Sequence, residues 1–516
     1  DIWNALVKDS TTTIDSHFDA IMDDLLLNIL GKEWRVRQAS CAAIGDLVQG
    51  RPLEKYEKYL EKIWGVCFKV LDDIKESVRT AAASLARVLT GILTRSLEAD
   101  SMASKNAAVL LKNVLPFLLS TSGIESSAEE VQSFSLHTLL EIIKKASGKI
   151  LRPFIPELVE RLVGLLSILE PQAVNYLHLN ASKYNLTEQK IDDIRLSSIR
   201  SSPLMEAIER CLDLLDESSM EQLQPRLEAA MKGAVGLPSK VGCSRVLVSL
   251  STRHNVLFKP YADLFLKLIE RQVIDRNETV SSSYAASSGY VARGASDKQI
   301  LRLASFARKL YFESEGDREQ AVPRQSIAAA EIMQAISKHA NDRFNSLASD
   351  LLPFIFFGKH DSHDQVKEIF RNTWEDNVGG SRAISLYLKE ILAMAQEYME
   401  SPQWVIKHTA ARSVADATTA LASMSSGFDS ATSQLIWPVL EKALAGKTWD
   451  GKETVLYAFT KFVESTKHIW SAEDAIAKTF VKVSKAFRFQ ARKPHVVPLL
   501  KHTKLRMGTR YPNQMC

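Results

Sequence analysis

The chain has 516 residues, more than one hydrophobic core can organise, because single cores stop growing at roughly 250–300 residues. With 21 glycines, 16 prolines and 24% charged residues, the composition excludes a disordered chain and favours an ordered, helix-rich one. The formal net charge of +4 is uneven: segment 475–516 holds ten Lys or Arg and no Asp or Glu, and subtracting these ten leaves −6 for residues 1–474. A main body without a sustained basic face argues against nucleic acid as the principal partner.

The cysteines and the apolar runs predict where the protein works. The five cysteines are Cys41, Cys67, Cys211, Cys243 and Cys516. They are far apart, odd in number and never in a CxxC pair, so we expect buried thiols in a reducing compartment, the cytoplasm or the nucleus. No apolar run approaches the ~18 residues that a spanning helix needs, and membrane insertion is not expected. The start at Asp1 without Met suggests the interior of a longer polypeptide.

A repeat begins with the first predicted helix, over 14–30, whose apolar residues are spaced three and four apart. After it, Trp34–Ser40 opens a second helix rich in small residues, and Glu76–Ala82 repeats this pattern. Weaker copies begin near Val131, Val241, Val280, Val322, Val366 and Val405. Most intervals are 39–44 residues, close to the ~40–47 residue period of HEAT units. The sequence therefore predicts an all-α solenoid of about ten stacked HEAT-type helical pairs between Ile14 and Lys467.

The repeat motif has a structural interpretation. Its assigned residues are Arg35, Val36, Arg37, Asp73, Val78 and Arg79. We expect Val78 to pack in the seam between the two helices of its pair. Asp73 precedes Arg79 by six residues, so it can reach across the turn or to the next repeat and build an Asp–Arg ladder. The ladder is imperfect, because Gly31 stands six residues before Arg37. A ligand-binding role for Arg79 is less favoured than this structural one.

Five prolines sit early in helix-like runs, as expected for the proline that bends the outer helix of HEAT units. They are Pro116, Pro156, Pro225, Pro353 and Pro438.

Two stretches break the repeat. The first, 170–202, is a longer connection within the fourth pair, and we expect it to be exposed and mobile. Two interpretations stay open: a segment that contacts a partner, or a solvated connector. The second break gives the domain division, a solenoid over 1–487 and a basic non-repeat tail over 488–516. An unpaired chain end is favoured for the tail over an interaction arm, and we expect it to be dispensable for the fold.

No catalytic, cofactor-binding or metal-binding residues are assigned. Ala445–Thr448 ends like a phosphate-binding loop, but Glu441 occupies the position of the first glycine and no strand precedes it. The dense cluster His360–Asp364 lacks the further ligand that a closed zinc site needs, and a polar turn with an Asp N-cap before Gln365 explains it better. Nucleophile-elbow, zinc-protease and dinucleotide motifs are missing from the sequence, so we expect neither an enzyme nor a small-molecule substrate.

Candidate partner contacts come from the long connection and from the tryptophans, which occur about once per repeat in the second half. Most of these tryptophans are expected to pack in the core or along a ridge, and a minority to anchor a partner. The candidates are Glu170, Tyr176, Arg195, Trp374 and Trp449.

Several segments together resemble one family. They are Ile2–Val7, Trp34–Leu53, Asp72–Arg79, Leu169–Gln172, Ser201–Glu206, Gly236–Cys243 and Gly446–Glu453. In this order they resemble the large HEAT-repeat proteasome adaptors and scaffolds, and the chain is similar to part of the C-terminal half of that family. The resemblance runs from residue 2 to about 467.

The resemblance implies a function that the composition and the repeat leave open. It implies a non-enzymatic adaptor in the cytoplasm and nucleus that bridges or stabilises the proteasome core and regulatory particles, the ATPase ring included, and influences assembly and quality control. The resemblance implies no catalytic residues, and the segment after Phe487 departs from the family pattern. The alternative hypothesis is a HEAT-repeat transport or chromatin scaffold whose basic tail contacts nucleic acid.

Overall fold

Helices make up the regular structure of the described residues. The computed structural model describes residues 10–98, 103–168, 172–313, 323–378, 380–424, 428–445, 449–469 and 478. Within these ranges every regular element is a helix, which confirms the all-α prediction. The basic tail over 488–516 lies outside the described residues. The chain divides into two compact units, Asp1–Leu257 and Phe258–Cys516.

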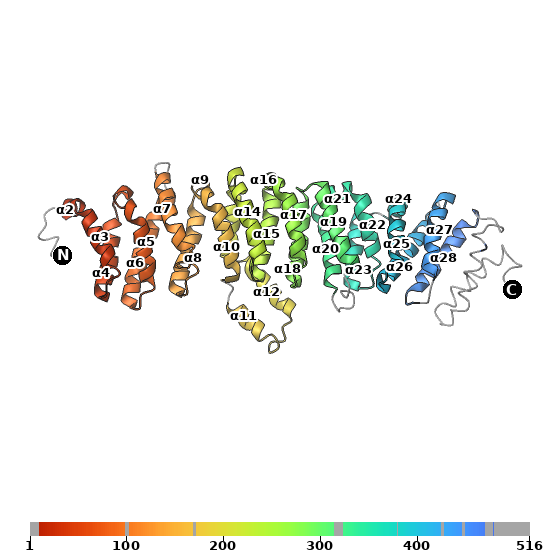
Figure 1. Cartoon of the computed structure of the whole chain (residues 1–516), viewed down its shortest axis with the longest axis horizontal. Coiled ribbons are helices and arrows are strands. Elements are labelled where there is room, and N and C mark those ends of the chain that lie inside the picture. The colour runs from red at the N-terminus through yellow and green to blue at the C-terminus, as the bar shows by residue number, and fades with distance from the viewer. Residues whose placement is uncertain are drawn as a thin grey trace. The chain divides into compact units, whose positions relative to one another are not determined.

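Each unit contains five helical pairs within the described residues, so the predicted number of about ten is confirmed (Figure 1). In the first unit they are α3 (Phe18–Asn28) with α4 (Trp34–Val48), α5 (Leu60–Leu71) with α6 (Glu76–Glu98), α7 (Ala103–Leu118) with α8 (Glu129–Lys145), α10 (Ile155–Ile168) with α13 (Pro203–Asp213), and α14 (Glu217–Gly233) with α15 (Leu237–Arg253). In the second they are α17 (Ala262–Val273) with α18 (Glu278–Ala292), α19 (Asp297–Phe312) with α20 (Arg324–His339), α22 (Ala348–Gly358) with α23 (Asp364–Asn377), α25 (Leu388–Tyr398) with α26 (Trp404–Ala422), and α27 (Ser430–Leu444) with α28 (Lys452–Thr466).

Short helices precede or join the pairs. They are α2 (Ser10–Ser16), η1 (Leu53–Lys55), η2 (Glu57–Tyr59), α9 (Gly148–Leu151), η3 (Arg152–Phe154), α16 (Asn255–Phe258), η4 (Lys259–Tyr261), α21 (Asn341–Ser346) and α24 (Arg382–Leu386).

The third residue of the second helix forms a recurring core position. Val78, Val131, Val280, Val366 and Ile406 all occupy it, and each side chain is at most 1% exposed. The predicted repeat starts at 131, 280 and 366 are therefore in register. Those at 241 and 405 are not, because these residues are the fifth of α15 and the second of α26, and residue 322 lies outside the described ranges.

All five prolines lie in first helices of pairs, as expected for an outer helix. Their predicted early position is correct for Pro156, the second residue of α10, whereas Pro116 lies near the end of α7 and the others lie in helix interiors.

Small residues let two second helices approach closely in the second unit. A Cβ atom built on Gly289 of α18 would lie 2.1 Å from the carbonyl oxygen of Ala335 in α20. Such a distance is far inside van der Waals contact, so only glycine fits without moving one helix.

The long connection of the fourth pair is helical. It folds into α11 (Gln172–Leu179) and α12 (Glu188–Arg200), which stand out from the pairs of the first unit in Figure 1. Val174, Ile191 and Ile199 are buried, and Thr187 caps α12 by accepting a hydrogen bond from the backbone N–H of Lys190. The segment is thus helical where we expected an exposed and mobile connection, although its buried apolar residues are few.

Candidate functional site

The predicted Asp–Arg ladder joins neighbouring pairs. Arg37 donates from Nε and Nη2 to the two carboxylate oxygens of Asp73, at 2.7 and 3.0 Å. Its Nη1 donates to the carbonyl oxygens of Gly31 and Lys32, at 3.0 and 2.9 Å. Arg79 likewise donates to the carbonyl oxygen of Asp73, at 2.9 Å. Each arginine therefore donates to the backbone carbonyl six residues before it, and the carboxylate of Asp73 accepts hydrogen bonds from Arg37 of the preceding pair.

The motif residues are not equivalent in the first and second pairs. Val78 is fully buried, whereas Val36, at the same position of α4, is 42% exposed. Arg35 lies outside the ladder, with its guanidinium 5.1 Å from the ring centroid of Trp34. Arg79 also forms an ion pair with Glu130 of the third pair, at 3.3 Å. The motif residues thus share the arginine contacts in both pairs but differ in the burial of the valine.

The candidate contacts in the long connection divide into two kinds. Tyr176 is 52% exposed, and its ring lies 6.4 Å from that of the exposed Tyr184. Arg195 instead forms an internal ion pair with Asp192, at 3.3 Å, and both side chains are largely buried. Arg195 is therefore a structural residue of α12. Glu170 lies outside the described residues.

Trp374 is a core residue, so its assignment as an exposed contact is wrong. It is 5% exposed and packs edge-on against Phe356, with ring centroids 4.9 Å apart. The ammonium group of Lys359 lies 5.2 Å from its ring centroid. The spacing of tryptophans along the sequence does not reveal which helix face each one occupies.

Trp449 belongs to an aromatic column on one face of α26. Trp404, His408 and Arg412 follow one another at four-residue intervals and share that face. The ring of Trp449 stacks on His408, with centroids 4.1 Å apart and planes 8° apart, and the guanidinium of Arg412 lies 5.3 Å from the Trp449 centroid. Trp404 lies 6.0 Å from His408 and is 69% exposed.

The turn before α28 makes room for this column. Gly451 has φ +103°, a left-handed conformation that side chains rarely adopt. A Cβ atom there would lie 2.9 Å from the Trp449 ring and 3.1 Å from Arg412. Glycine at this position thus lets the turn pack against the Trp449 ring.

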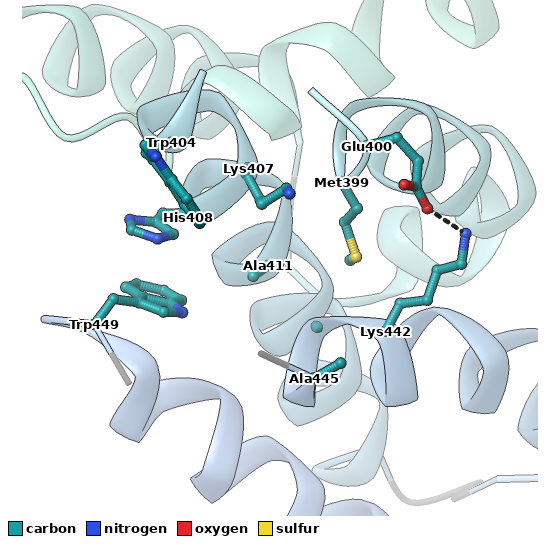
Figure 2. A pocket seen from close by; sticks show the side chains of 10 residues that line it. Met399, Glu400, Trp404, Lys407, His408, Ala411, Lys442, Ala445 and Trp449 are labelled. Atoms are coloured by element: carbon teal, nitrogen blue, oxygen red, sulfur yellow. Dashed lines mark hydrogen bonds and ion pairs between the residues drawn. The ribbon is translucent and has the colours of Figure 1, made fainter. Parts of the chain in front are cut away.

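A pocket of about 290 Å³ lies beside the column. Figure 2 shows Trp404, His408 and Trp449 on one side of it and the ion pair Glu400–Lys442 on the other. The pocket is further lined by Met399, Lys407, Ala411, Ala443 and Ala445. It lies between the ninth and tenth pairs, where the turns of both pairs meet.

Cations dominate this pocket. Glu400 pairs with Lys442 at 2.8 Å, which lowers the pKa of the carboxyl group. Lys407 lies 5.2 Å from the Trp404 ring centroid and makes no ion pair within the described ranges. Burial, together with the nearby Arg412 and Lys407, lowers the pKa of His408, so its ring is neutral at neutral pH. The sequence analysis picked out Trp449 but missed Trp404, Lys407 and His408; the four-residue interval from Trp404 to His408 along α26 was the available signal.

The cluster His360–Asp364 separates into two structural contacts. Asp361 accepts a hydrogen bond from the Tyr311 hydroxyl and, at 2.8 Å, from the backbone N–H of His363. His360 faces Asp416 at 3.3 Å. The predicted Asp cap of α23 is wrong in position, because the helix begins at Asp364 and the side chain that turns the chain is Asp361. No group of three or more His, Cys, Asp or Glu positioned to hold a metal occurs in the described ranges.

Two further findings concern membranes and nucleotides. None of the helices that the structure describes is long and apolar enough to cross a bilayer. Of the phosphate-loop-like segment, Ala445 lines the pocket, and 446–448 lie outside the described residues.

Comparisons with known proteins support the resemblance seen in the sequence. A family model described as "Proteasome adapter and scaffold protein ECM29, HEAT-repeat domain" matches residues 151–312. The chain is 33% identical over 466 residues to "Proteasome component ECM29" of Saccharomyces cerevisiae, covering 90% of this chain and 24% of that protein. It is 34% identical over 464 residues to "Proteasome adapter and scaffold protein ECM29" of Homo sapiens, covering 89% of this chain and 24% of that protein.

The chain therefore spans about a quarter of the length of these relatives. Among solved structures, importin β aligns with a TM-score of 0.32 at 11% identity, over 96% of this chain and 70% of that chain. Kap121p bound to Pho4p aligns with a TM-score of 0.34 at 11% identity, over 98% of this chain and 56% of that chain. Nothing about function is drawn from likenesses this weak. The family resemblance carried by the sequence motifs is confirmed over about nine-tenths of the chain.

Proposed function

We propose, starting from this relationship to the ECM29 proteasome adapter and scaffold proteins, that the chain is part of a non-enzymatic proteasome scaffold. In this role it binds proteasome core and regulatory-particle subunits, the ATPase ring among them, and bridges or stabilises the two particles. The observation that carries the proposal is sequence identity of 33–34% to two such proteins over about 90% of the chain. Influence on proteasome assembly and quality control follows from holding the two particles together.

The architecture suits a protein that binds other proteins. Stacked helical pairs expose long rows of turns and helix faces, which repeat proteins use as extended binding surfaces. In the first unit the exposed Tyr176 and Leu179 project from α11, and in the second Trp404 and Trp449 line the pocket. These are the described surfaces at which we place partner contacts, because exposed aromatic side chains are the residues that most often anchor protein interfaces.

The same proposal assigns the protein to the cytoplasm and nucleus. Cys41, Cys67, Cys211 and Cys243 are buried, and none of these four described cysteines forms a disulfide bond. Burial raises the pKa of Cys41 to about 11, so its thiol stays protonated and unreactive at neutral pH. Four buried cysteines outside any disulfide suit a reducing compartment.

Affinity capture tests the proposal. The tagged chain, incubated at moderate salt with purified core particles, purified regulatory particles or both, should retain at least one of the particles on the resin. Retention of a mixture of the two on the chain, above the level retained without it, would support bridging. Failure to retain either particle, with a folded chain verified by circular dichroism, would overturn the proposal for this segment.

The transport or chromatin alternative is not favoured by the comparisons, whose relatives are named as proteasome components. It predicts nucleic-acid binding that disappears when 488–516 are deleted and falls steeply with salt, because phosphate contacts release counterions. Capture of import cargo or chromatin from a lysate without proteasome subunits would favour this alternative.

A further inference from the structure

We propose that the pocket between the ninth and tenth pairs binds an acidic peptide segment of a protein partner and holds one large apolar side chain of that segment against the Trp404–His408–Trp449 column. The inference deepens the proposed scaffold function, and it rests on that function only in taking the partner to be a protein. It goes further by naming the place of contact and the chemistry of the partner.

The apolar part of the site selects a side chain. Three alanines, Ala411, Ala443 and Ala445, are among the lining residues, and the aromatic column forms one side of the pocket (Figure 2). Pockets that enclose a whole small molecule are about 300–1,000 Å³, and the 290 Å³ found here lies just below that range. This size suits one large side chain of a peptide better than a nucleotide or a cofactor.

The indole of Trp404 has the exposure expected of an unoccupied anchor. It is 69% exposed although it stands at the start of a helix whose next core position, Ile406, is 1% exposed. Covering an exposed indole with an apolar side chain removes a large apolar area from water, and tryptophan is among the residues most enriched at interface hot spots. A partner side chain lying on Trp404 would also extend the stack that His408 and Trp449 already form.

Charge selects an acidic segment. The charged side chains that line the pocket are Lys407, Lys442 and one carboxylate, Glu400, which Lys442 already neutralises. Arg412 lines the neighbouring pocket instead, with Asp361, Asp416, Asp450 and Glu453, and its guanidinium donates to the backbone carbonyl oxygens of His360 and Asp450. Among the lining residues Lys407 therefore remains to attract a carboxylate of a partner.

The same argument excludes the chain's own C-terminal segment as the occupant. Residues 475–516 contain ten Lys or Arg and no Asp or Glu, so their charge repels that of the pocket. The occupant is therefore an acidic segment outside 475–516, and we assign it to a protein partner.

Fluorescence anisotropy with a synthetic probe tests the inference. The probe is a short fluorescein-labelled peptide of aspartate and glutamate residues with one central phenylalanine, and it should bind the chain with an affinity that falls as salt is added. Two matched peptides, one with alanine in place of the phenylalanine and one with amides in place of the acids, should each bind about tenfold more weakly or worse.

Paired variants localise the binding. Trp404→Ala and Lys407→Glu should each weaken binding by about tenfold or more. The control variants are Leu386→Ala, which truncates a side chain that is 71% exposed, and Lys389→Glu, on the exposed side of α25. Both should bind the probe like the parent chain. Melting temperatures measured on all four variants show whether a loss of binding reflects a loss of folding, and Lys407→Ala replaces Lys407→Glu if the latter is unfolded.

Defined outcomes overturn the inference. They are no detectable binding of the acidic probe, equal binding of the amide peptide, affinity unchanged in both pocket variants, or displacement of the probe by ATP or a single-stranded oligonucleotide at lower concentration than by unlabelled peptide. Proteasome capture by the same variants separates this inference from the proposed function. Probe binding without particle capture would leave the pocket assignment standing and remove the proteasome proposal, whereas capture without probe binding would do the reverse.

Discussion

Arg37 donates hydrogen bonds to both carboxylate oxygens of Asp73, which lies 36 positions further along the chain in the next helical pair. This hydrogen-bonded ion pair joins the turn of the first pair to the turn of the second. Hydrogen bonding to Arg37 lowers the pKa of Asp73 below its ordinary value of 3.8. The contact therefore favours folding wherever the carboxylate is ionised.

Replacing Asp73 tests this link. Asp73→Asn should lower the melting temperature of the chain by about 1–3 °C at neutral pH, since one charged partner of Arg37 is lost. Because the folded pKa lies below 3.8, the contribution is fully present above that pH and is lost as the pH falls through the folded value. The difference from the parent should thus shrink as the pH falls below 3.8. Asp72→Asn, a change at the exposed neighbour, should have no such effect, and equal losses in both variants would contradict the assignment.

A matched pair of valines tests the seam. Val78→Asp should cost about 3–5 kcal/mol in the free energy of unfolding, because it buries a carboxylate without a partner. Val36→Asp, at the same motif position but 42% exposed, should change the free energy by no more than about 0.5 kcal/mol. Urea unfolding followed by circular dichroism measures both. Similar losses in the two variants would show that the first pair is packed as tightly as the second.

Two helical glycines should respond in opposite directions to the same substitution. Gly289→Ala places a methyl group 2.1 Å from a carbonyl oxygen of α20 and should destabilise the second unit by about 1–3 kcal/mol. Gly91→Ala, in α6, meets nothing within 4 Å and should stabilise the first unit by about 0.5–1 kcal/mol through helix propensity. Thermal melts of the two variants decide the matter. Stabilisation by Gly289→Ala would mean that α18 and α20 are not in close contact.

Glu331 should make stability depend on pH. Burial raises its pKa to about 7 from 4.5, although Ser282 donates a hydrogen bond to it at 2.9 Å. Between these two values the folded chain holds a proton that the unfolded chain has released, so stability falls as the pH rises from 4.5 to 7. Glu331→Gln should remove this dependence, with a gain on the order of 2–3 kcal/mol at pH 8 and little change at pH 4. Glu368→Gln on α23 is the exposed control, and identical pH profiles of parent and Glu331→Gln would contradict the prediction.

Proteolysis should map the inserted helices. Lys183 lies in the exposed turn between α11 and α12, whereas Arg195 is ion-paired and largely buried in α12. Within 172–200, trypsin should therefore cut first after Lys183 and leave Arg195 intact. Mass spectrometry of early fragments identifies the cut. Early cleavage after Arg195 would show that α12 opens readily and would restore the interpretation of the segment as a mobile loop.

The repeat could be read from the sequence because its signal is local. Val78 and its counterparts stand at a fixed number of residues from the start of a helix, and this spacing can be counted along the sequence. The exposure of Val36 could not be predicted the same way, because it depends on which neighbours surround the first pair. The ladder was predicted only in part. The spacing of Asp73 and Arg79 was visible, but the arginines also bind backbone carbonyl oxygens, and a residue of any type can supply such an oxygen. Gly31 therefore accepts a hydrogen bond from Arg37 through its backbone carbonyl oxygen, although its residue type gives no sign of this role.

The candidate site was harder to predict for a related reason. Trp374 and Trp449 have similar sequence surroundings, yet the first is buried and the second lines a pocket. The difference comes from the packing of one pair on the next, which brings the turn before α28 against His408 of α26. The helices of the 170–202 segment were missed because their few apolar residues, such as Ile191 and Ile199, are too sparse to outweigh the polar residues between them.

The placement of α11 and α12 within a pair has a practical consequence. The segment leaves the fourth pair after Ile168 and returns to it at Pro203, and α10 packs directly against α13 across the gap. Length added at the turn around Lys183 is therefore absorbed locally and does not shift the register of the pairs on either side. This turn offers a permissive position for a fluorescent reporter or an affinity tag, from which the first unit can be followed while both ends of the chain stay unmodified.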